Sequence, residues 1–371
     1  MEKLHVLHVI EQLALGGAER MAVDLANETA RCGHRVTVCV TRLVDTLAAE
    51  LRPEIHVIRL ARRSNYELGP VLRLLRYVRR ENVDLVHAHM RSSMALLLPF
   101  RALRIIPVPV VVHDHYGAIE VDTSVPRWFR IGHRWIDAYV GVSPSLGAWA
   151  RTAGLPADRI EVIPNALDLT RLTSAGTADL PGELGLAAGT TLALIVATIR
   201  PDKGIEVALE AIAAVRHDRP IHVAIAGTLA DPQYQAMLEA RCRELGLDGK
   251  VTFLGARRDV PALLAACDLA LSSSHTESGP LVLIEFLVAG RAFVATRVGD
   301  IGRRLAAAGL AGFVPPRDPA AMARAIEELL ALPAAERATR GAAGRGFLGE
   351  FDLRAVFPRW LAVYARARGA A

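Results

Sequence analysis

Two cations in one short loop of the sequence could bind a phosphate-bearing ligand. Arg200 and Lys203 lie three residues apart in the segment 197–204, directly after an apolar run of strand character. At the carboxyl end of a strand they could grip a diphosphate, with each charge-assisted hydrogen bond contributing about 1.5 to 3 kcal/mol. Surface cations are also common without a ligand, so an ordinary solvated loop remains the alternative.

Two carboxylates accompany a predicted helix start in the second half of the chain. Gly279 and Pro280 suit a first helical turn, where the missing N–H of proline costs nothing. Glu277 therefore falls in the preceding loop, and Glu285 falls about two turns inside the helix. The helix start could hold an anion, and both carboxylates could accept hydrogen bonds from ligand hydroxyls. An unpaired Glu285 would be costly to bury in the apolar run 281–288, which favours a binding role.

Paired glycines mark a third candidate site near the start of the chain. Gly16 and Gly17 stand between a predicted strand and a predicted helix. Without a Cβ the backbone can approach a ligand closely, and the helix start supplies N–H groups for an anion. The segment is not the Gly-x-Gly-x-x-Gly dinucleotide fingerprint, so a simple strand-to-helix turn stays open as the alternative.

Two histidine pairs have a spacing that metal sites also use. His87 and His89, and likewise His113 and His115, are alternate residues of predicted strands and so share one face. No carboxylate cluster completes a site around them, and no Asp-x-Asp occurs in the sequence. We therefore predict no metal ligands, and a bound diphosphate must be neutralised by cationic side chains and helix ends.

Alternating strands and helices must position these residues. Short β-branched runs followed by amphipathic stretches predict βα units and a parallel sheet. The predicted strands are 5–10, 36–41, 83–87, 108–113, 192–198, 222–226, 251–254, 269–272 and 292–296, with helices at 18–31 and 204–216.

The α/β pattern is interrupted once, which indicates two domains. A chain of 371 residues is also too long for one ordinary core. We predict a first Rossmann-like domain at 1–168, a Pro-, Gly- and Ser-rich linker at 169–189, a second Rossmann-like domain at 190–350, and a final helical segment at 351–371 that returns to the first domain. Such sheets bind ligands at the carboxyl ends of their strands, so we expect the domains to face a central cleft.

Composition indicates a soluble globular protein. The chain is 52% hydrophobic and 22% charged, and it has no apolar run long enough to span a membrane. It has no signal-peptide pattern, and its four cysteines lack Cys-x-x-Cys spacing, so we expect a cytoplasmic location.

The net charge of +5 favours anionic partners. Nucleic acid is disfavoured because no recognition-helix, zinc-finger or RNA-binding signature accompanies the charge. Arg73, Arg76 and Arg80 follow helical spacing beside Leu72, Leu75 and Val78. This face could make peripheral contact with an anionic membrane, with a solvated outer face as the alternative.

Taken together, the motifs resemble those of the retaining GT-B glycosyltransferases of family four. The likeness extends over almost the whole chain. It rests on the segments 16–20, 112–114, 142–143, 163–168, 200–204, 277–285 and 295–299 in this order.

The resemblance implies a role for each candidate residue. Gly16 and Gly17 would approach the donor sugar or its diphosphate, Arg200 and Lys203 would bind the diphosphate, Glu277 the transferred sugar and Glu285 the ribose, while Ser278 and Gly279 would add backbone contacts and His113 would face the donor sugar. Ala166, Ser278-Gly279 and Gly227-Thr228 depart from the common family pattern, which leaves the donor base and sugar open.

The function that the resemblance implies is sugar transfer from a nucleotide-diphosphate sugar, with retention of anomeric configuration and without a metal or other cofactor. A glycan or lipid-linked glycan is the expected acceptor. The alternatives are a nucleotide-sugar 2-epimerase and a catalytically silent assembly protein that binds nucleotide sugar.

Overall fold

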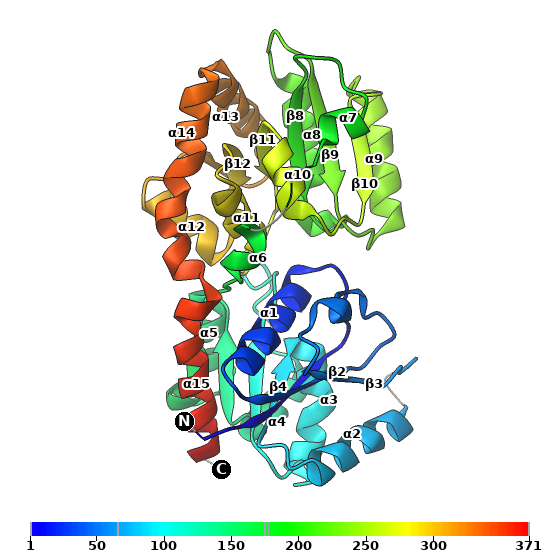
Figure 1. Ribbon diagram of the computed structural model, residues 1–371, viewed down its shortest axis with the longest axis vertical. Coiled ribbons are helices and arrows are strands. Elements are labelled where there is room, and N and C mark those ends of the chain that lie inside the picture. The colour runs from blue at the N-terminus through cyan, green and yellow to red at the C-terminus, as the bar shows by residue number, and fades with distance from the viewer. Residues whose placement is uncertain (1, 65–66, 174–175, 177, 370–371) are drawn as a thin grey trace. The chain divides into compact units, whose positions relative to one another are not determined.

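The chain folds into two compact units in the computed structural model, which describes residues 2–64, 67–173, 176 and 178–369 (Figure 1). The first unit comprises the residues up to Leu167 together with those from Asp352 onward, and the second runs from Asp168 to Phe351. Each unit has its own parallel sheet, which confirms the prediction of two Rossmann-like domains.

The first unit is a seven-stranded sheet in the order β3-β2-β1-β4-β5-β6-β7. Its strands are β1 (His5–Ile10), β2 (Arg35–Val40), β3 (His56–Arg59), β4 (Leu85–His89), β5 (Val110–Asp114), β6 (Ala138–Gly141) and β7 (Ile160–Val162). The helices are α1 (Gly17–Arg31), α2 (Leu68–Arg80), α3 (Met90–Ala102), α4 (Arg127–Gly132), α5 (Pro144–Thr152) and α15 (Leu353–Gly369). The order of the strands reverses between β1 and β4, which makes their carboxyl ends the expected ligand edge.

The second unit is a six-stranded sheet in the order β10-β9-β8-β11-β12-β13. Its strands are β8 (Thr191–Val196), β9 (Ile221–Ala226), β10 (Val251–Gly255), β11 (Leu269–Ser272), β12 (Phe293–Thr296) and β13 (Phe313–Val314). The helices are α6 (Leu169–Thr173), α7 (Leu180–Glu183), α8 (Ile205–Ala214), α9 (Pro232–Glu244), α10 (Val260–Ala266), α11 (Leu281–Ala289), α12 (Gly299–Ala307), α13 (Pro319–Ala331) and α14 (Ala334–Ala343). Here the strand order reverses between β8 and β11.

The central strands are buried on both faces, as expected for parallel sheets covered by helices. Every residue of β1, β4 and β5 is buried, and only Val196 of β8 is partly accessible. Most residues of these strands are apolar, and the polar residues of β1 and β4 are buried histidines.

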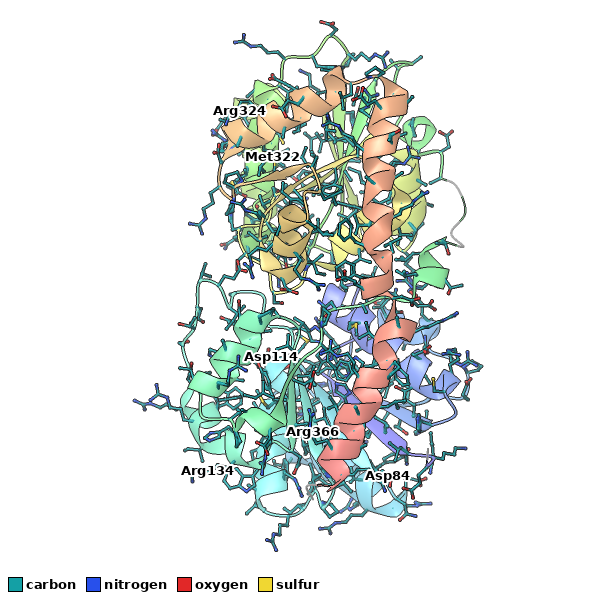
Figure 2. All side chains as sticks on the ribbon, turned by 90° about the vertical axis from the view of Figure 1, so that its left-hand side faces the viewer. Asp84, Asp114, Arg134, Met322, Arg324 and Arg366 are labelled. Atoms are coloured by element: carbon teal, nitrogen blue, oxygen red, sulfur yellow. The ribbon has the colours of Figure 1, made fainter. Side chains whose placement is uncertain are left out.

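The last helix, α15, belongs to the first unit, which confirms the predicted return of the chain. Trp360 and Tyr364 are fully buried, and Leu353 N donates to Leu167 O at 3.0 Å. Arg368 Nη2 lies 3.6 Å from Asp84 Oδ1, near the end of the unit where Figure 2 labels Asp84 and Arg366. Pro358 lies inside this helix and does not end it.

Candidate functional site

In the second unit, two loops meet where the strand order reverses. The loop after β8 carries Arg200 and Lys203, and the loop after β11 carries Glu277. Since β8 and β11 are hydrogen-bonded neighbours, their carboxyl ends lie side by side. The sheet topology therefore brings together cations and a carboxylate that are about 75 residues apart in sequence.

Lys203 and Glu277 form the central ion pair of this edge. Lys203 Nζ lies 2.5 Å from Glu277 Oε1, and the two side chains are only 15% and 13% exposed. Ser274 Oγ donates to the same carboxylate oxygen at 2.9 Å. Such a charge-assisted pair in a partly water-excluded position is held in one geometry. An entering anion would therefore meet a positioned ammonium group that already has a carboxylate partner.

Arg200 lies in the same loop and is more exposed to solvent than Lys203. Its Nε lies 2.8 Å from Asp202 Oδ1, and its side chain is 48% exposed. Asp202 Oδ2 also lies 4.0 Å from Lys203 Nζ. The two predicted cations thus share Asp202 as a neighbour, and the structure places them in one site.

Backbone contacts hold the two loops against each other. Gly204 has φ of 56°, and a Cβ there would lie 2.5 Å from Ser273 O and 2.8 Å from the His275 ring. Ser273 Oγ donates to Lys203 O at 3.2 Å, and His275 N donates to Asp202 O at 2.8 Å. The site geometry therefore depends on glycine at position 204, because any side chain would push the loops apart.

The segment Glu277–Pro280 leads into helix α11 and is hydrogen-bonded to the first turn of α12. Asp300 N donates to Ser278 O at 3.0 Å, and Ser278 and Gly279 are buried. Pro280 is the N-cap residue, so α11 begins at Leu281. Glu285 is therefore about one turn inside the helix, not the predicted two, because Gly279 and Pro280 precede the helix rather than form its first turn. Its side chain is half-buried.

A polar network beside this edge was missed by the sequence analysis. Tyr234 Oη donates to the Glu206 carboxylate and accepts from Ile205 N at 2.9 Å. The other carboxylate oxygen lies 2.8 Å from His275 Nε2. Burial, followed by the bond to Glu206, raises the pKa of Tyr234 well above its ordinary value. The network orients His275, which packs on Gly204, but its members come from three separate segments and have no common motif.

In the first unit, His113 lies at the end of β5 within a group of imidazoles. It pairs in register with His89 of β4. Its ring centroid lies 3.9 Å from that of His115 and 4.5 Å from that of Trp360 on α15. Burial holds the pKa of His113 well below its ordinary value, and the neighbouring histidines lower it further. The side chain is therefore a neutral imidazole and not a cation.

The paired glycines stand at the start of α1, as predicted. Gly16 is the N-cap residue and Gly17 is the first helical residue, which is exposed. A Cβ on Gly16 would collide with the carboxylate of Glu19. Because a carboxylate at the end of a flexible side chain can move, this contact alone does not require glycine at position 16, and Gly16 is partly accessible to solvent while Gly17 is exposed.

A second missed feature is a positioned guanidinium after β4. Arg91 lies between the rings of Tyr116 and Trp149, 4.0 Å from each centroid. Its Nε donates to Asp114 Oδ2 at 2.9 Å, and Tyr139 Oη donates to the same oxygen at 2.8 Å. The aromatic contacts and the buried carboxylate together fix this cation at the ligand edge of the first sheet. Only Asp114 of this group belonged to a motif that the sequence analysis named.

The predicted basic face on α2 is exposed but less apolar than expected. Arg73, Arg76 and Arg80 are exposed, whereas Leu75 and Val78 are buried in the core. Leu72 is 46% exposed. Among the described residues, no helix combines the length and apolar character that crossing a membrane requires.

Comparisons with known families divide the chain in two. Residues 15–171 match Glycosyltransferase Family 4, and residues 178–346 match Glycosyl transferases group 1. The chain is 32% identical over 236 residues to D-inositol 3-phosphate glycosyltransferase of Nocardia farcinica, which covers 59% of this chain and 52% of that protein. It is 26% identical over 224 residues to N-acetyl-alpha-D-glucosaminyl L-malate synthase of Bacillus anthracis, covering 59% and 58%. The chain thus spans between half and three fifths of the length of these relatives.

Solved structures show the same fold over the whole chain. The Anabaena protein HepE in complex with UDP-glucose superimposes with a TM-score of 0.81 at 22% identity, covering 98% of this chain and 99% of that one. Sucrose-phosphate synthase of Thermosynechococcus elongatus gives a TM-score of 0.81 at 20% identity over both complete chains. The predicted GT-B fold is confirmed.

Proposed function

Because the chain belongs to the group 1 glycosyltransferases of family four, we propose that it transfers a sugar from a nucleotide-diphosphate sugar to an acceptor, with retention of anomeric configuration and without a metal. The observation that carries the proposal is the ion pair between Lys203 and Glu277 beside Arg200, at the point where the second sheet reverses its strand order. This edge offers cations for a diphosphate and a carboxylate for sugar hydroxyls within one rigid pair of loops.

The donor would replace contacts that the ligand-free site makes with itself. The diphosphate would take Lys203 from Glu277 and Arg200 from Asp202. Glu277 would then accept hydrogen bonds from the sugar, and Glu285 on α11 would accept them from the ribose. Ser278 and Gly279 would present backbone groups at the start of α11. The ion pair thus keeps the ammonium group in place until phosphate oxygens displace the carboxylate.

The chemistry needs charge stabilisation more than a protein base. As the sugar-phosphate bond breaks, positive charge develops at the anomeric carbon and negative charge on the leaving diphosphate. Lys203 and Arg200 would stabilise the leaving group more in the transition state than in the ground state. The acceptor would attack from the leaving-group face, and the diphosphate would take its proton. His113, as a neutral imidazole, would line the donor-sugar side rather than supply charge.

The partners follow from the relatives and the surface charge. HepE binds UDP-glucose, which supports a uridine-diphosphate sugar as donor here. A glycan or lipid-linked glycan is the proposed acceptor, with Gly16 and Gly17 of the first unit near the transferred sugar. Arg73, Arg76 and Arg80 on α2 would make peripheral contact with an anionic inner membrane face.

A panel of nucleotide sugars tests this proposal directly. A donor that binds the folded protein raises its unfolding temperature according to RT ln(1 + [L]/Kd). The stabilising donor is then incubated with candidate acceptors, and free nucleotide diphosphate and glycosylated product are measured together. Nucleotide diphosphate released without any acceptor would favour the epimerase, and binding with no transfer to any acceptor would favour the silent assembly protein.

A further inference from the structure

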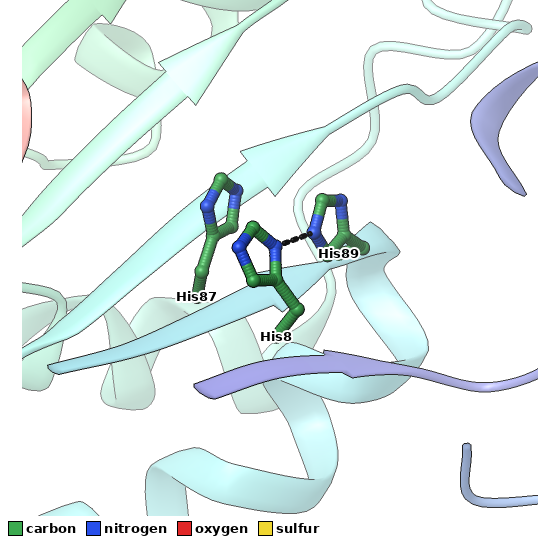
Figure 3. A group of neighbouring side chains, drawn as sticks. All are labelled: His8, His87 and His89. Atoms are coloured by element: carbon green, nitrogen blue, oxygen red, sulfur yellow. Dashed lines mark hydrogen bonds between the residues drawn. The ribbon is translucent and has the colours of Figure 1, made fainter. Parts of the chain in front are cut away.

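Three imidazoles meet on one face of the first sheet, where its strand order reverses. His8 comes from β1, and His87 and His89 come from β4, with His8 in register with His87 (Figure 3). Their ring centroids are 4.9, 5.2 and 4.2 Å apart. One ring nitrogen from each residue lies within 4.8 Å of the other two. All three side chains are buried.

Tyr364 on α15 contacts one ring nitrogen of His87. His87 Nδ1 lies 2.9 Å from Tyr364 Oη. The other ring nitrogen, His87 Nε2, is buried without a hydrogen-bond partner among the described residues. When His87 Nδ1 donates to Tyr364, the lone pair of His87 lies on Nε2, where it can bind a metal ion.

His8 and His89 each also have one ring nitrogen without a hydrogen-bond partner among the described residues. His8 Nδ1 lies 2.9 Å from His89 Nε2, and only one of the two can donate (Figure 3). In either tautomer, His8 Nε2 and His89 Nδ1 keep one lone pair and one N–H between them, so a metal ion that binds both rings must replace the hydrogen bond between them. Both atoms are buried and lack partners in the part of the chain that the structure describes. Buried polar atoms in native proteins nearly always have partners, so this group calls for a ligand.

We propose that His8, His87 and His89 bind one divalent transition-metal ion of the zinc class. Imidazole nitrogen suits zinc, copper and nickel, and not magnesium or calcium. Zn–N bonds of about 2.0 to 2.1 Å place tetrahedral ligand nitrogens about 3.3 Å apart, so nitrogens that now lie up to 4.8 Å apart must draw together by up to about 1.5 Å. Tyr364 fills the outer position that a ligating histidine ordinarily uses to fix its tautomer. The ion connects β1 to β4 and, through Tyr364, to α15.

The sequence alone predicted no metal ligands, because only two of the three histidines are close together in the chain. His87 and His89 alone supply two ligands on one face, and no carboxylate follows them. The third imidazole comes from His8, which lies 79 positions earlier and reaches the pair only through the pairing of β1 with β4.

Zinc binding to the full-length chain tests the site. The protein is stripped with a chelator, and Zn²⁺ is titrated in competition with a chromophoric chelator, while Co²⁺ absorption reports the ligand geometry. We expect one equivalent of Zn²⁺ to bind, with no competition from Mg²⁺. Replacing a ligand by His87→Phe should weaken binding more than about 100-fold, since losing an outer partner alone costs about 10- to 100-fold.

Two further variants keep the test decisive if His87→Phe fails to fold. Tyr364→Phe retains the ring and removes only the outer hydrogen bond, so it should weaken Zn²⁺ about 10- to 100-fold. His222→Phe removes a histidine of the second unit that contacts Thr252, and should leave binding unchanged. Absence of a bound equivalent in the wild-type chain would overturn the proposal. Equal Zn²⁺ affinities of the wild-type, His87→Phe and Tyr364→Phe proteins would also overturn it. So would a site that is lost with His115→Gln but retained with His87→Phe.

Discussion

The two sheets place different chemistry at equivalent points. Where the second sheet reverses its strand order, an ammonium and a carboxylate pair at 2.5 Å and remain partly accessible. Where the first sheet reverses, neutral imidazoles stack in full burial. The same topology therefore presents charge in one unit and uncharged nitrogen donors in the other. The second edge should respond to anions and salt, and the first to acid and transition metals.

The largest expected effect is acid unfolding of the first unit in the metal-free protein. Burial lowers the pKa of His8 to about 3 and holds those of His87, His89 and His113 well below their ordinary value. Below about pH 6.5 the unfolded chain takes up protons that the folded sheet does not, so stability falls as the pH falls from there. At pH 5 a histidine that stays neutral in the folded state costs about 2 kcal/mol of stability, which is a large share of a usual total of about 5 to 15 kcal/mol.

Tryptophan fluorescence isolates this effect, because Trp128, Trp135, Trp149 and Trp360 all belong to the first unit. The signal should report unfolding between pH 6 and 4, while nucleotide-diphosphate binding reports on the second unit at the same pH. His222→Gln, in the second unit, should leave the transition in place. A tryptophan signal that persists to pH 4 in the chelated protein would show that the imidazoles are not held neutral by burial.

The sequence predicted which segments form strands better than it predicted which residues contact each other. The strands His5–Ile10 and Leu269–Ser272 were predicted to the residue. The strands β3, β6, β7 and β13 were missed; they have two to four residues, and periodicity in so short a segment is a weak signal even where, as for Leu269–Ser272, it succeeds. Likewise, Lys203 and Glu277 were each predicted to act on a ligand, but nothing in the sequence indicated that they pair with each other.

The next effect tests the charged edge of the second unit. Replacing Arg200 and Lys203 together by alanine should weaken nucleotide-diphosphate binding by about 3 to 5 kcal/mol, more than about 100-fold, if the contacts add. Isothermal titration with the nucleotide diphosphate measures this loss. Arg324→Ala, an exposed change on α13, is the matched control. Unchanged affinity in the double variant would show that the diphosphate does not bind at this edge of the second sheet.

A smaller effect should separate the two carboxylates. Glu277→Gln frees Lys203 from its partner, so affinity for the bare nucleotide diphosphate should hold or rise. Its turnover at saturating donor should fall about 10- to 100-fold, because sugar contacts that strengthen in the transition state are lost. Glu285→Gln should instead weaken the bare nucleotide by about 1.5 to 3 kcal/mol, as expected for lost charge-assisted bonds to ribose. The opposite pattern would mean that the two roles are exchanged or wrong.

The smallest expected effect concerns the outer face of the first unit. Leu75 and Val78 are buried, so the solvent-facing side of α2 offers a membrane its arginines together with the exposed Leu68 and Leu72, and the arginines should make binding depend on charge. Each arginine near an anionic surface contributes about 1 kcal/mol, so Arg76→Gln should reduce liposome cosedimentation about fivefold. Binding should also fall between low and high salt, because a short Debye length screens exposed charges. Arg324→Gln of the second unit removes the same charge and should have no effect. If Arg76→Gln and Arg324→Gln lose liposome binding equally, the net charge of the protein drives binding, and α2 is not a specific membrane contact. The first unit would then have no special role in membrane contact.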